Sequence, residues 1–397
     1  MNKTITLLST LLLLGAVSAP AATVTVLRGS VIFSEIMPSG ENIRIEFASC
    51  MANKLYTFKS VSVNGTPVNT TTSDNIGPFM LADGSWTGGN HLNNDVRSAR
   101  TNAVRVYVDG QEVSRDKQAS YKDCSVLDIE VDNILLIPGK EDKEFAEEKM
   151  SYRVAGNSID VTAHHTYKNE SPITVSRYYG MQSMMQGETE ILTPGGSYSR
   201  WTPTAGVNRF TRASAPDFCT FIEHSPECYQ AAYMTTEGLG DRHLIDDNDW
   251  VFIGNSYSKS YHKTIGDKQV RAGDETMWHG VYTWFVEPVL DGCRDEAGSG
   301  EFEYAGYLDG KPVIFHLNSD GTMSTGSAGA DKNEIATQPP FASAGRGTIA
   351  VDPACPSAVV YNLAGAAVHR GCGTFNCRPG VYIVSDGRGK SLKMLVR

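Results

Sequence analysis

Short runs in which apolar and polar residues alternate recur along most of the chain, and this period of two constrains its fold most strongly. Examples are TVTVLRGSVIF from Thr23, AVRVYVDG from Ala103 and SIDVTAHHTY from Ser158. Alternation places successive side chains on opposite faces of a strand, and the Asp-Gly and Asn-Gly pairs that close several runs are typical of hairpin turns. Helical periodicity is nearly absent; EDKEFAEEKMSYR, from Glu141, is the one segment that could form a short helix, with a charged loop as the alternative.

We therefore expect an all-β protein built from sandwiches. Composition and pattern divide it into a signal (1–22), an N-terminal β region (23–140), a main β-sandwich (141–325), a linker (326–346) and a small C-terminal β-sandwich module (347–397). The linker is predicted because that stretch is rich in Gly, Ser, Ala and Pro and poor in hydrophobic residues. The main sandwich could be a supersandwich or a jelly roll.

The first residues are typical of a cleavable secretory signal. One cation, Lys3, precedes a leucine-rich core, and the small residues of Ala19-Pro20-Ala21 follow it. We expect cleavage after Ala21 or Ala22 and a protein that is secreted or displayed on the cell surface. The apolar core is shorter than the roughly 20 residues of a membrane-spanning helix. No other segment approaches that length, so no membrane span is expected.

Charge and cysteine content narrow the class of partner and the compartment. The formal net charge of −10 argues against nucleic acid, which requires a basic face. All 8 cysteines follow the signal, and an even count in an exported chain suggests disulfides. Because short loops close most easily, we expect Cys219 to pair with Cys228 and Cys372 with Cys377; the other four allow three pairings. The absence of a CxxC motif disfavours zinc.

The last fifty or so residues contain AVVYNLAGAAVHRG, from Ala358, and then RPGVYIVSDGRGKSLKMLVR. These two elements, in this order, resemble the C-terminal sorting domain that Bacteroidota attach to proteins secreted by the type IX route. In that family a V-x-V-Y-N-x-x-G strand precedes L-x-x-G-x-Y-I-V and a last strand with a lysine. The resemblance implies that the tail engages secretion machinery. The insert CGTFNC departs from the family pattern and leaves the processing of the tail open.

Two stretches of the middle region, MSYRVAGNSIDVTAHHTYKNESPITVSRYYG and VRAGDETMWHGVYTWFVEP, resemble galactose-mutarotase-like supersandwiches. There, a strand, an N-x-S-x-x-P turn and a strand precede a closing strand. That superfamily includes sugar epimerases and β-domains of polysaccharide lyases and glycoside hydrolases. The resemblance therefore implies a polysaccharide or surface glycan as the partner.

Histidines and aromatic residues supply the candidate chemistry. His164 and His165 are neighbours in an alternating strand, so at most one of them faces a given site. Sugars stack their C–H faces on aromatic rings and need polar partners for their hydroxyls. The candidate catalytic residues are His164, His165, Tyr179, His243 and His279, and the candidate substrate-binding residues are Trp86, Asn90, His91, Gln182, Trp278 and Tyr282. The alternative is that these histidines are packed or solvated and that the aromatic residues fill the β core.

The segment DRHLIDDNDW, from Asp241, concentrates carboxylates. Asp246, Asp247 and Asp249 could hold Ca²⁺ through oxygen ligands or supply an acid and a base. The segment lacks the glycine and final glutamate of an EF-hand loop, and a solvated acidic loop is the alternative. No other cofactor is expected.

The chain contains neither a GxSxG nor an HExxH motif. We expect a secreted carbohydrate-interacting protein and, if it is an enzyme, a polysaccharide lyase or glycoside hydrolase. In a lyase, Tyr or His would remove the proton α to a uronate carboxylate. A non-catalytic surface adhesin, a glycan-binding module or a structural surface protein is the alternative.

Overall fold

The computed structural model describes the chain in segments that all lie between Ala22 and Val396. They are residues 22–37, 40–69, 75–184, 189–192, 198–201, 208–210, 219–225, 228–235, 241, 244–245, 251–254, 259–285, 302–318, 322–327, 342–345, 347–362, 367–378, 380–385 and 391–396. Within these ranges the extended elements are all β-strands, so the all-β prediction is confirmed. No helix among the described residues is long and apolar enough to cross a membrane.

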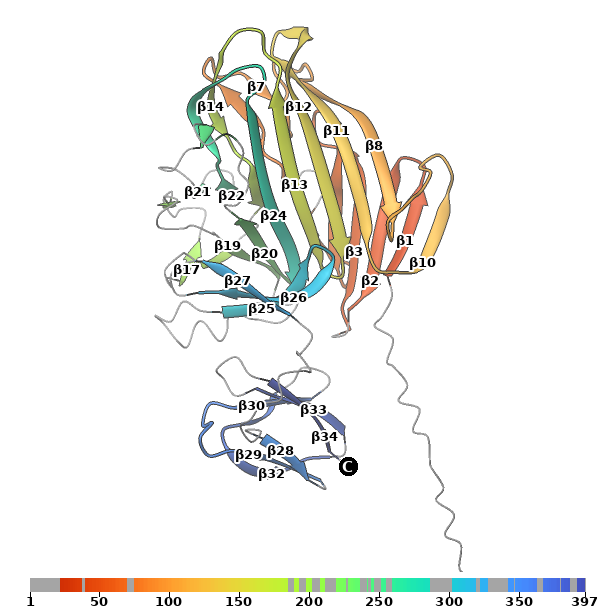
Figure 1. The fold of residues 1–397 in the computed structure, drawn as a ribbon, viewed down its shortest axis with the longest axis vertical. Coiled ribbons are helices and arrows are strands. Elements are labelled where there is room, and N and C mark those ends of the chain that lie inside the picture. Colours follow the sequence, from red (N-terminus) through yellow and green to blue (C-terminus); the bar gives the residue numbers. More distant parts are fainter. Residues whose placement is uncertain are drawn as a thin grey trace, which may run out of the picture.

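Two large antiparallel sheets form the main body (Figure 1). The first sheet has the order β10 (Ala119–Cys124), β1 (Ala22–Leu27), β2 (Ser30–Ile36), β3 (Asn42–Cys50), β4 (Leu55–Val63) and β5 (Thr66–Asn69). The central sheet has the order β19 (Cys219–Ser225), β20 (Cys228–Thr235), β24 (Glu275–Phe285), β13 (Ser158–Tyr167), β12 (Lys140–Ala155), β11 (Leu127–Ile137), β8 (Ala99–Val108) and β9 (Gln111–Glu112).

Smaller sheets complete the body. They are β23 (Ile265–Val270), β14 (Ile173–Tyr178), β6 (Phe79–Leu81) and β7 (Trp86–Thr87); β15 (Met181–Met184), β22 (Lys259–His262), β21 (Val251–Gly254) and β18 (Asn208–Phe210); β16 (Thr189–Leu192) and β17 (Tyr198–Trp201); and β25 (Phe302–Leu308), β26 (Lys311–Leu317) and β27 (Met323–Ser327).

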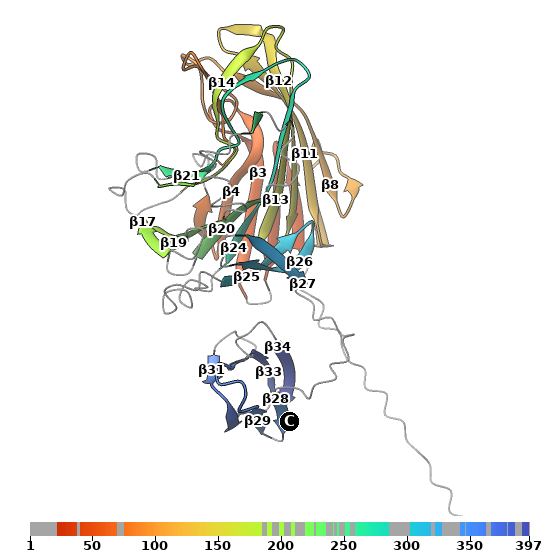
Figure 2. The same cartoon turned by 60° about the vertical axis from the view of Figure 1, so that its left-hand side comes forward.

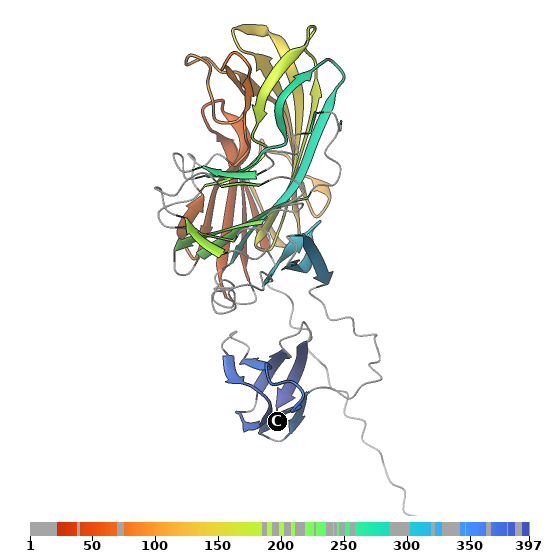
Figure 3. The same cartoon turned by 90° about the vertical axis from the view of Figure 1, so that its left-hand side faces the viewer.

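The first and central sheets lie face to face (Figures 2 and 3). Aromatic side chains pack between them. Phe47 on β3 packs edge-on against Tyr152 on β12, with ring centroids 5.4 Å apart, and Phe58 on β4 lies 5.4 Å from Tyr282 on β24. All four side chains are almost fully buried. We call the face of the central sheet that meets the first sheet its inner face, and the opposite one its outer face.

Strand β12 replaces the helix or loop expected for EDKEFAEEKMSYR, and that expectation was wrong. Met150, Tyr152 and Val154 are buried, whereas Lys149 and Ser151, which precede Met150 and Tyr152, are exposed. This period of two is partly hidden in the sequence because the charged residue Glu148 is also buried on the inner face. The region boundary expected at residue 140 falls at the turn between β11 and β12, which pair along their length, so one sheet spans both sides of it.

The C-terminal strands form a small body of their own (Figure 1). One sheet contains β28 (Ala342–Gly345), β29 (Thr348–Val351) and β32 (Gly373–Asn376); the other contains β31 (Ala367–Arg370), β30 (Val359–Asn362), β33 (Gly380–Ser385) and β34 (Ser391–Val396). Both sheets contribute buried side chains to one core, among them Ile349, Val351, Val360 and Val384. The expectation of a small C-terminal β-sandwich agrees with this arrangement.

Candidate functional site

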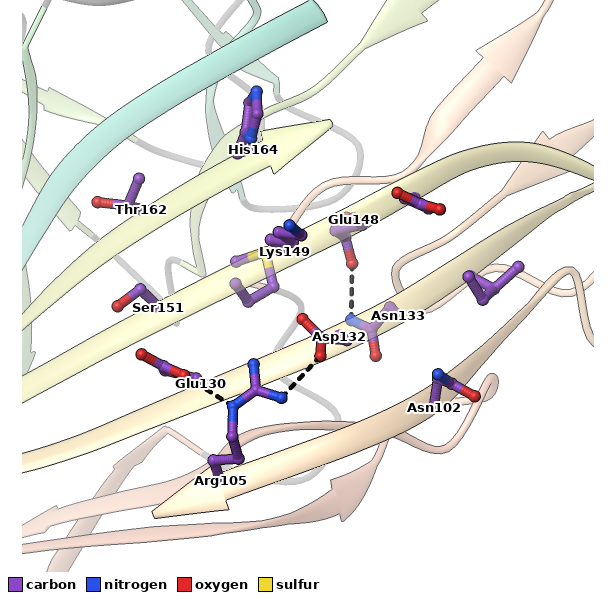
Figure 4. A pocket seen from close by; sticks show the side chains of 13 residues that line it. Asn102, Arg105, Glu130, Asp132, Asn133, Glu148, Lys149, Ser151, Thr162 and His164 are labelled. Atoms are coloured by element: carbon purple, nitrogen blue, oxygen red, sulfur yellow. Dashed lines mark hydrogen bonds and ion pairs between the residues drawn. The ribbon is translucent and has the colours of Figure 1, made fainter. Parts of the chain in front are cut away.

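A hollow of about 520 Å³ lies over β8, β11, β12 and β13 (Figure 4). Most of the side chains drawn around it are polar or charged. Because alternate residues of each strand point the same way, the register of the ladders decides which side chains meet there. The hollow therefore follows from the pairing of strands that are far apart in the sequence.

Two rows of side chains cross the outer face of the central sheet. In the first, Asp132, Lys149 and His164 lie directly opposite one another on β11, β12 and β13. In the second, Ser151 on β12 lies opposite Thr162 on β13. We call the short side chains of Ser151 and Thr162 the floor of the hollow and the longer side chains of Lys149 and His164 one of its walls.

Arg105 on β8 forms the opposite wall together with two carboxylates of β11. Its Nε donates to Oε2 of Glu130 at 2.8 Å and its Nη1 donates to Oδ2 of Asp132 at 3.0 Å (Figure 4). These hydrogen bonds raise the pKa of Arg105 further above its ordinary value, so the guanidinium stays charged. The fork holds the two carboxylates in fixed positions, with oxygen atoms available to a ligand.

His164 is placed where a titratable group can meet a ligand. Its side chain is 35% exposed, and its Nε2 lies 3.5 Å from Oε2 of Glu275 on β24. Lys149 is its cross-strand neighbour on β12 and is exposed. A carboxylate that orients an accessible imidazole beside a cation is an arrangement that can transfer a proton.

His279 also lies on the outer face, opposite Thr162. It forms an ion pair with Asp160, whose other carboxylate oxygen accepts a hydrogen bond from the backbone N–H of Asp309. These contacts join β24, β13 and the turn between β25 and β26. His279 is thus close to the hollow but is held by structural contacts, and it does not line the cavity.

His165 lies on the inner face and is fully buried. Its Nε2 is 2.9 Å from Oε2 of Glu148, and Oε1 of Glu148 accepts a hydrogen bond from Nδ2 of Asn133 at 2.8 Å. Oδ1 of Asn133 in turn accepts one from the hydroxyl of Thr101 at 2.7 Å. His165 therefore belongs to a buried polar chain between the sheets, away from solvent.

Three further candidates stack on one another beside β7. The ring of Trp86 lies 4.4 Å from that of His91 and 6.0 Å from that of Tyr179. Asn90 accepts a hydrogen bond from the N–H of Ala52, which ties its loop to the first sheet. The structure brings these residues together, but none of them lines the outer-face hollow.

The remaining described candidates belong to the core. Trp278 is fully buried and donates from its indole N–H to the hydroxyl of Tyr178 at 2.7 Å. The hydroxyl of Tyr282 donates to the carbonyl of Gln182 at 2.7 Å, and both residues are buried. The indole N–H of Trp278 and the hydroxyl of Tyr282 thus have partners inside the protein. The sequence could not distinguish such a packed aromatic residue from one that lines a site.

His243, Asp246, Asp247 and Asp249 lie outside the described residues, so the predicted calcium ligands stay a prediction. Among the residues that are described, no group of three His, Cys, Asp or Glu side chains could hold a metal ion.

The two predicted disulfides do not fit the strands. Cys219 on β19 pairs with Tyr233, five residues along β20 from Cys228, and β32 extends between Cys372 and Cys377. A strand rises about 3.3 Å per residue, so each pair is separated by about 17 Å. A disulfide requires Cα atoms within about 7 Å. Cys228, Cys372 and Cys377 are free thiols in the structure.

Apart from His164, the side chains that we assign to the floor and walls of the hollow were not predicted. They are Arg105, Glu130, Asp132, Lys149, Ser151 and Thr162. One signal was available, since Asp128, Glu130 and Asp132 alternate with apolar residues and must share a face. The partners of that acidic row depend on strand order and register, which alternation alone does not determine.

No protein-family model matches the chain, and no curated protein matches it at a significant level. Among solved structures, the chain is similar to a putative aldose 1-epimerase from Klebsiella pneumoniae, with 9% identity and a TM-score of 0.34 over 68% of this chain and 85% of that one. An aldose 1-epimerase is thus among the similar structures, as the resemblance of the middle region implies.

Two other similar structures are a galactosidase domain and a lyase. The galactosidase domain of an α-galactosidase-sucrose kinase has 9% identity and a TM-score of 0.33 over 67% of this chain and 41% of that one. A mutant of a heparan sulfate lyase from Pedobacter heparinus has 10% identity and a TM-score of 0.30 over 76% and 41%. In both cases the chain spans less than half of the matched protein. Values this low carry no inference about function.

Proposed function

We propose that the outer-face hollow binds a carbohydrate. The observation that carries the proposal is the lining, which combines hydroxyls on the floor with carboxylates, a guanidinium and an ammonium on the walls. Each sugar hydroxyl donates and accepts hydrogen bonds, so a carbohydrate needs both kinds of partner on one surface. The volume of about 520 Å³ is within the range of pockets that hold one small ligand.

The accessibility of the hollow favours a polymer or surface glycan. Lys149 and Ser151 are exposed, and His164 and Thr162 are half-buried, so a ligand can reach the floor directly from solvent. A sugar unit within a long chain can therefore approach as readily as a free sugar. An apolar ligand would leave the charged walls without partners, which costs free energy.

Filling the floor tests this proposal. Thr162→Trp places a large ring between the walls, and Thr66→Trp adds the same ring at an exposed position on β5. We expect T162W to lose retardation in affinity gels cast with the polysaccharide that retards the wild type, whereas T66W keeps it. A panel of acidic and neutral polysaccharides supplies the ligands. Equal retardation of T162W and the wild type would exclude the hollow as the binding site.

A second candidate function is cleavage of an acidic polysaccharide, and the His164–Glu275 contact favours it. Lys149, opposite His164, would neutralise a uronate carboxylate. His164, oriented by Glu275, would take the proton from the carbon next to that carboxylate. The electron pair left behind would form a carbon–carbon double bond as the neighbouring C–O bond breaks, and the proton would pass to the leaving oxygen, as in a polysaccharide lyase. A glycoside hydrolase would instead need two carboxylates, and Arg105 already engages both Glu130 and Asp132.

Product analysis separates these activities from binding alone. New absorbance from unsaturated products, lost in His164→Ala, supports the lyase, and new reducing ends without that absorbance support a hydrolase. Retardation without either product would exclude both the lyase and the hydrolase activity. The protein would then be a non-catalytic adhesin or glycan-binding protein.

We also propose that the protein is exported and that its C-terminal module engages secretion machinery. The signal-like start and the sorting-like motifs support export. The C-terminal module has a hydrophobic core of its own, which is consistent with a separate domain. Mass spectrometry of protein recovered outside the cell should give an N-terminus at Ala22 or Thr23. Removal of residues 347–397 should retain the protein inside the producing cell; unchanged export would contradict the role of the module.

A further inference from the structure

The loop after β29, which carries Cys355, lies against the turn between β31 and β32, which carries Cys372, at one corner of the C-terminal module. Both cysteines are free thiols in the structure. Neither of the pairings expected from sequence spacing fits the strands, but this corner brings a different pair together. We propose that Cys355 and Cys372 form a disulfide bond that joins the two sheets of the module.

The ladder between β29 and β32 is the first feature that brings the backbone near Cys355 close to that near Cys372. Its last rung joins Val351 to Gly373, and the residues that come next along the two chains are Asp352 and Cys372. The N–H of Cys355 donates to the carbonyl of Asp352 at 2.9 Å. That bond closes a β-turn, which brings its first and last Cα atoms within about 7 Å.

The hairpin of β30 and β31 independently brings the same two stretches of backbone close together. The N–H of Gly371 donates to the carbonyl of Ala358 at 2.7 Å, and the N–H of Ala358 donates to the carbonyl of Cys355 at 3.2 Å. A Cβ built on Gly371 would lie only 3.8 Å from the carbonyl oxygen of Pro356. Cys372 directly follows Gly371, and Cys355 directly precedes Pro356.

Cys372 lies between two glycines whose backbone is in the left-handed region. Gly371 and Gly373 have φ angles of +98° and +103°, which glycine adopts without the strain that a side chain would cause. Cys372 itself is exposed, and Cys355 is half-buried against the core of the module. One thiol is thus accessible to an oxidant, and the other is held in position.

Cys377, the other cysteine of this module, is placed to remain a thiol. It lies at the far end of β32 and packs against the core. Burial raises the pKa of its thiol, although a hydrogen bond with Tyr382 lowers it. A raised pKa decreases the fraction of thiolate, which is the species that attacks a disulfide.

Formation of the bond requires a disulfide donor, such as oxidised glutathione or an oxidoreductase of an oxidising compartment. The thiolate of Cys372 attacks one sulfur of the donor and releases the first donor thiol. The thiolate of Cys355 then attacks Cys372 in the mixed disulfide and releases the second. Two protein thiols are oxidised, the donor disulfide is reduced to two thiols, and the protons of the protein thiols end on the donor thiols.

Peptide mapping of the full-length protein tests the proposal. The purified protein is equilibrated with oxidised and reduced glutathione, alkylated and digested without reduction. We expect the peptide with Cys355 to be linked to the peptide that holds Cys372 and Cys377. Because one peptide carries both of these residues, Cys372→Ser and Cys377→Ser identify the partner: the link is lost in C372S and kept in C377S.

Three results would overturn the assignment. They are a link that survives in C372S and disappears in C377S, a bridge between Cys372 and Cys377 within one peptide, and complete alkylation of Cys355 after equilibration in the most oxidising buffer. Since the map is read on the wild type as well as on the variants, a variant that fails to fold does not remove the test.

Discussion

His164 and His165 are neighbours on β13, yet they lie in opposite environments. His165 is fully buried on the inner face, 2.9 Å from Glu148. His164 is 35% exposed on the outer face, 3.5 Å from Glu275. The pleat of one strand therefore separates a histidine that is held among buried polar partners from one that can meet a ligand. Residue type alone does not distinguish the two roles.

The polar groups of the two faces also differ in their energetic effect. On the inner face, the buried side chains of Asn133, Glu148 and His165 have lost water and depend on their protein partners. On the outer face, Arg105 is 40% exposed, and water can replace a lost partner. We expect substitutions on the inner face to affect folding and those on the outer face to affect binding.

The largest effect should come from Glu148→Ala, which leaves both His165 and Asn133 without their buried partner. Removal of one member of a buried pair costs about 3–5 kcal/mol. Urea unfolding monitored by tryptophan fluorescence measures this loss. Glu147→Ala, at the adjacent half-buried position on the outer face, is the matched control and should change the free energy of unfolding by less than about 0.5 kcal/mol. Equal losses in the two variants would remove the distinction between the faces.

Glu35 offers a pH test with a second buried carboxylate, whose partner is the N–H of Gly156 instead of a histidine. Burial raises the pKa of Glu35 from 4.5 to about 7, although the Gly156 hydrogen bond lowers it. Between these values the folded state binds a proton that the unfolded state has released. Folding is therefore favoured at the acidic end, and this contribution is lost as pH rises toward 7.

For Glu35 the expected loss over that pH range is about 2–3 kcal/mol. Glu35→Gln, which stays neutral, should remove this part of the pH dependence. Urea denaturation at several pH values between 4.5 and 7.5 measures it. A wild type and an E35Q variant with parallel pH profiles would show that Glu35 does not titrate in this range.

The smallest effect on stability should come from Arg105→Ala, because exposed ion pairs contribute about 0–1 kcal/mol. Carbohydrate binding should nevertheless weaken by about tenfold, which corresponds to about 1.4 kcal/mol, because Glu130 and Asp132 lose the fork that positions them. Arg153→Ala is the matched control: Arg153 is also 40% exposed on the outer face and pairs with Asp128 and Asp309, but it does not line the hollow. Isothermal titration calorimetry measures the affinity for the carbohydrate. If both variants bind with the affinity of the wild type, Arg105 does not belong to the binding site.

Alternation in the sequence was sufficient to predict the all-β class and the opposite orientations of His164 and His165. It was not sufficient for β12, where Glu148 occupies an inward position and interrupts the apolar pattern. Its partner, His165, comes from the next strand, so the reason for a buried carboxylate is not visible locally. The hollow was missed for a related reason, because Lys149 meets Asp132 and His164 only through strand register.

Cysteine spacing misled because separation along the chain was taken as separation in space. Cys372 and Cys377 are close in sequence, but the extended backbone of β32 between them keeps them apart in space. A turn and a hairpin instead bring Cys355 toward Cys372 across a longer stretch of chain. Closure entropy favours short loops only where the intervening residues are free to bend.

A side-by-side measurement on His164→Ala and His165→Ala tests the central claim most directly. For each variant, the free energy of unfolding in urea and the retardation in the polysaccharide gel are measured on the same preparation. We predict that H164A unfolds like the wild type but loses retardation, and that H165A is strongly destabilised while its folded fraction is still retarded. Retardation of H164A equal to that of the wild type, or a loss of retardation in folded H165A alone, would contradict the assignment of binding to the outer face.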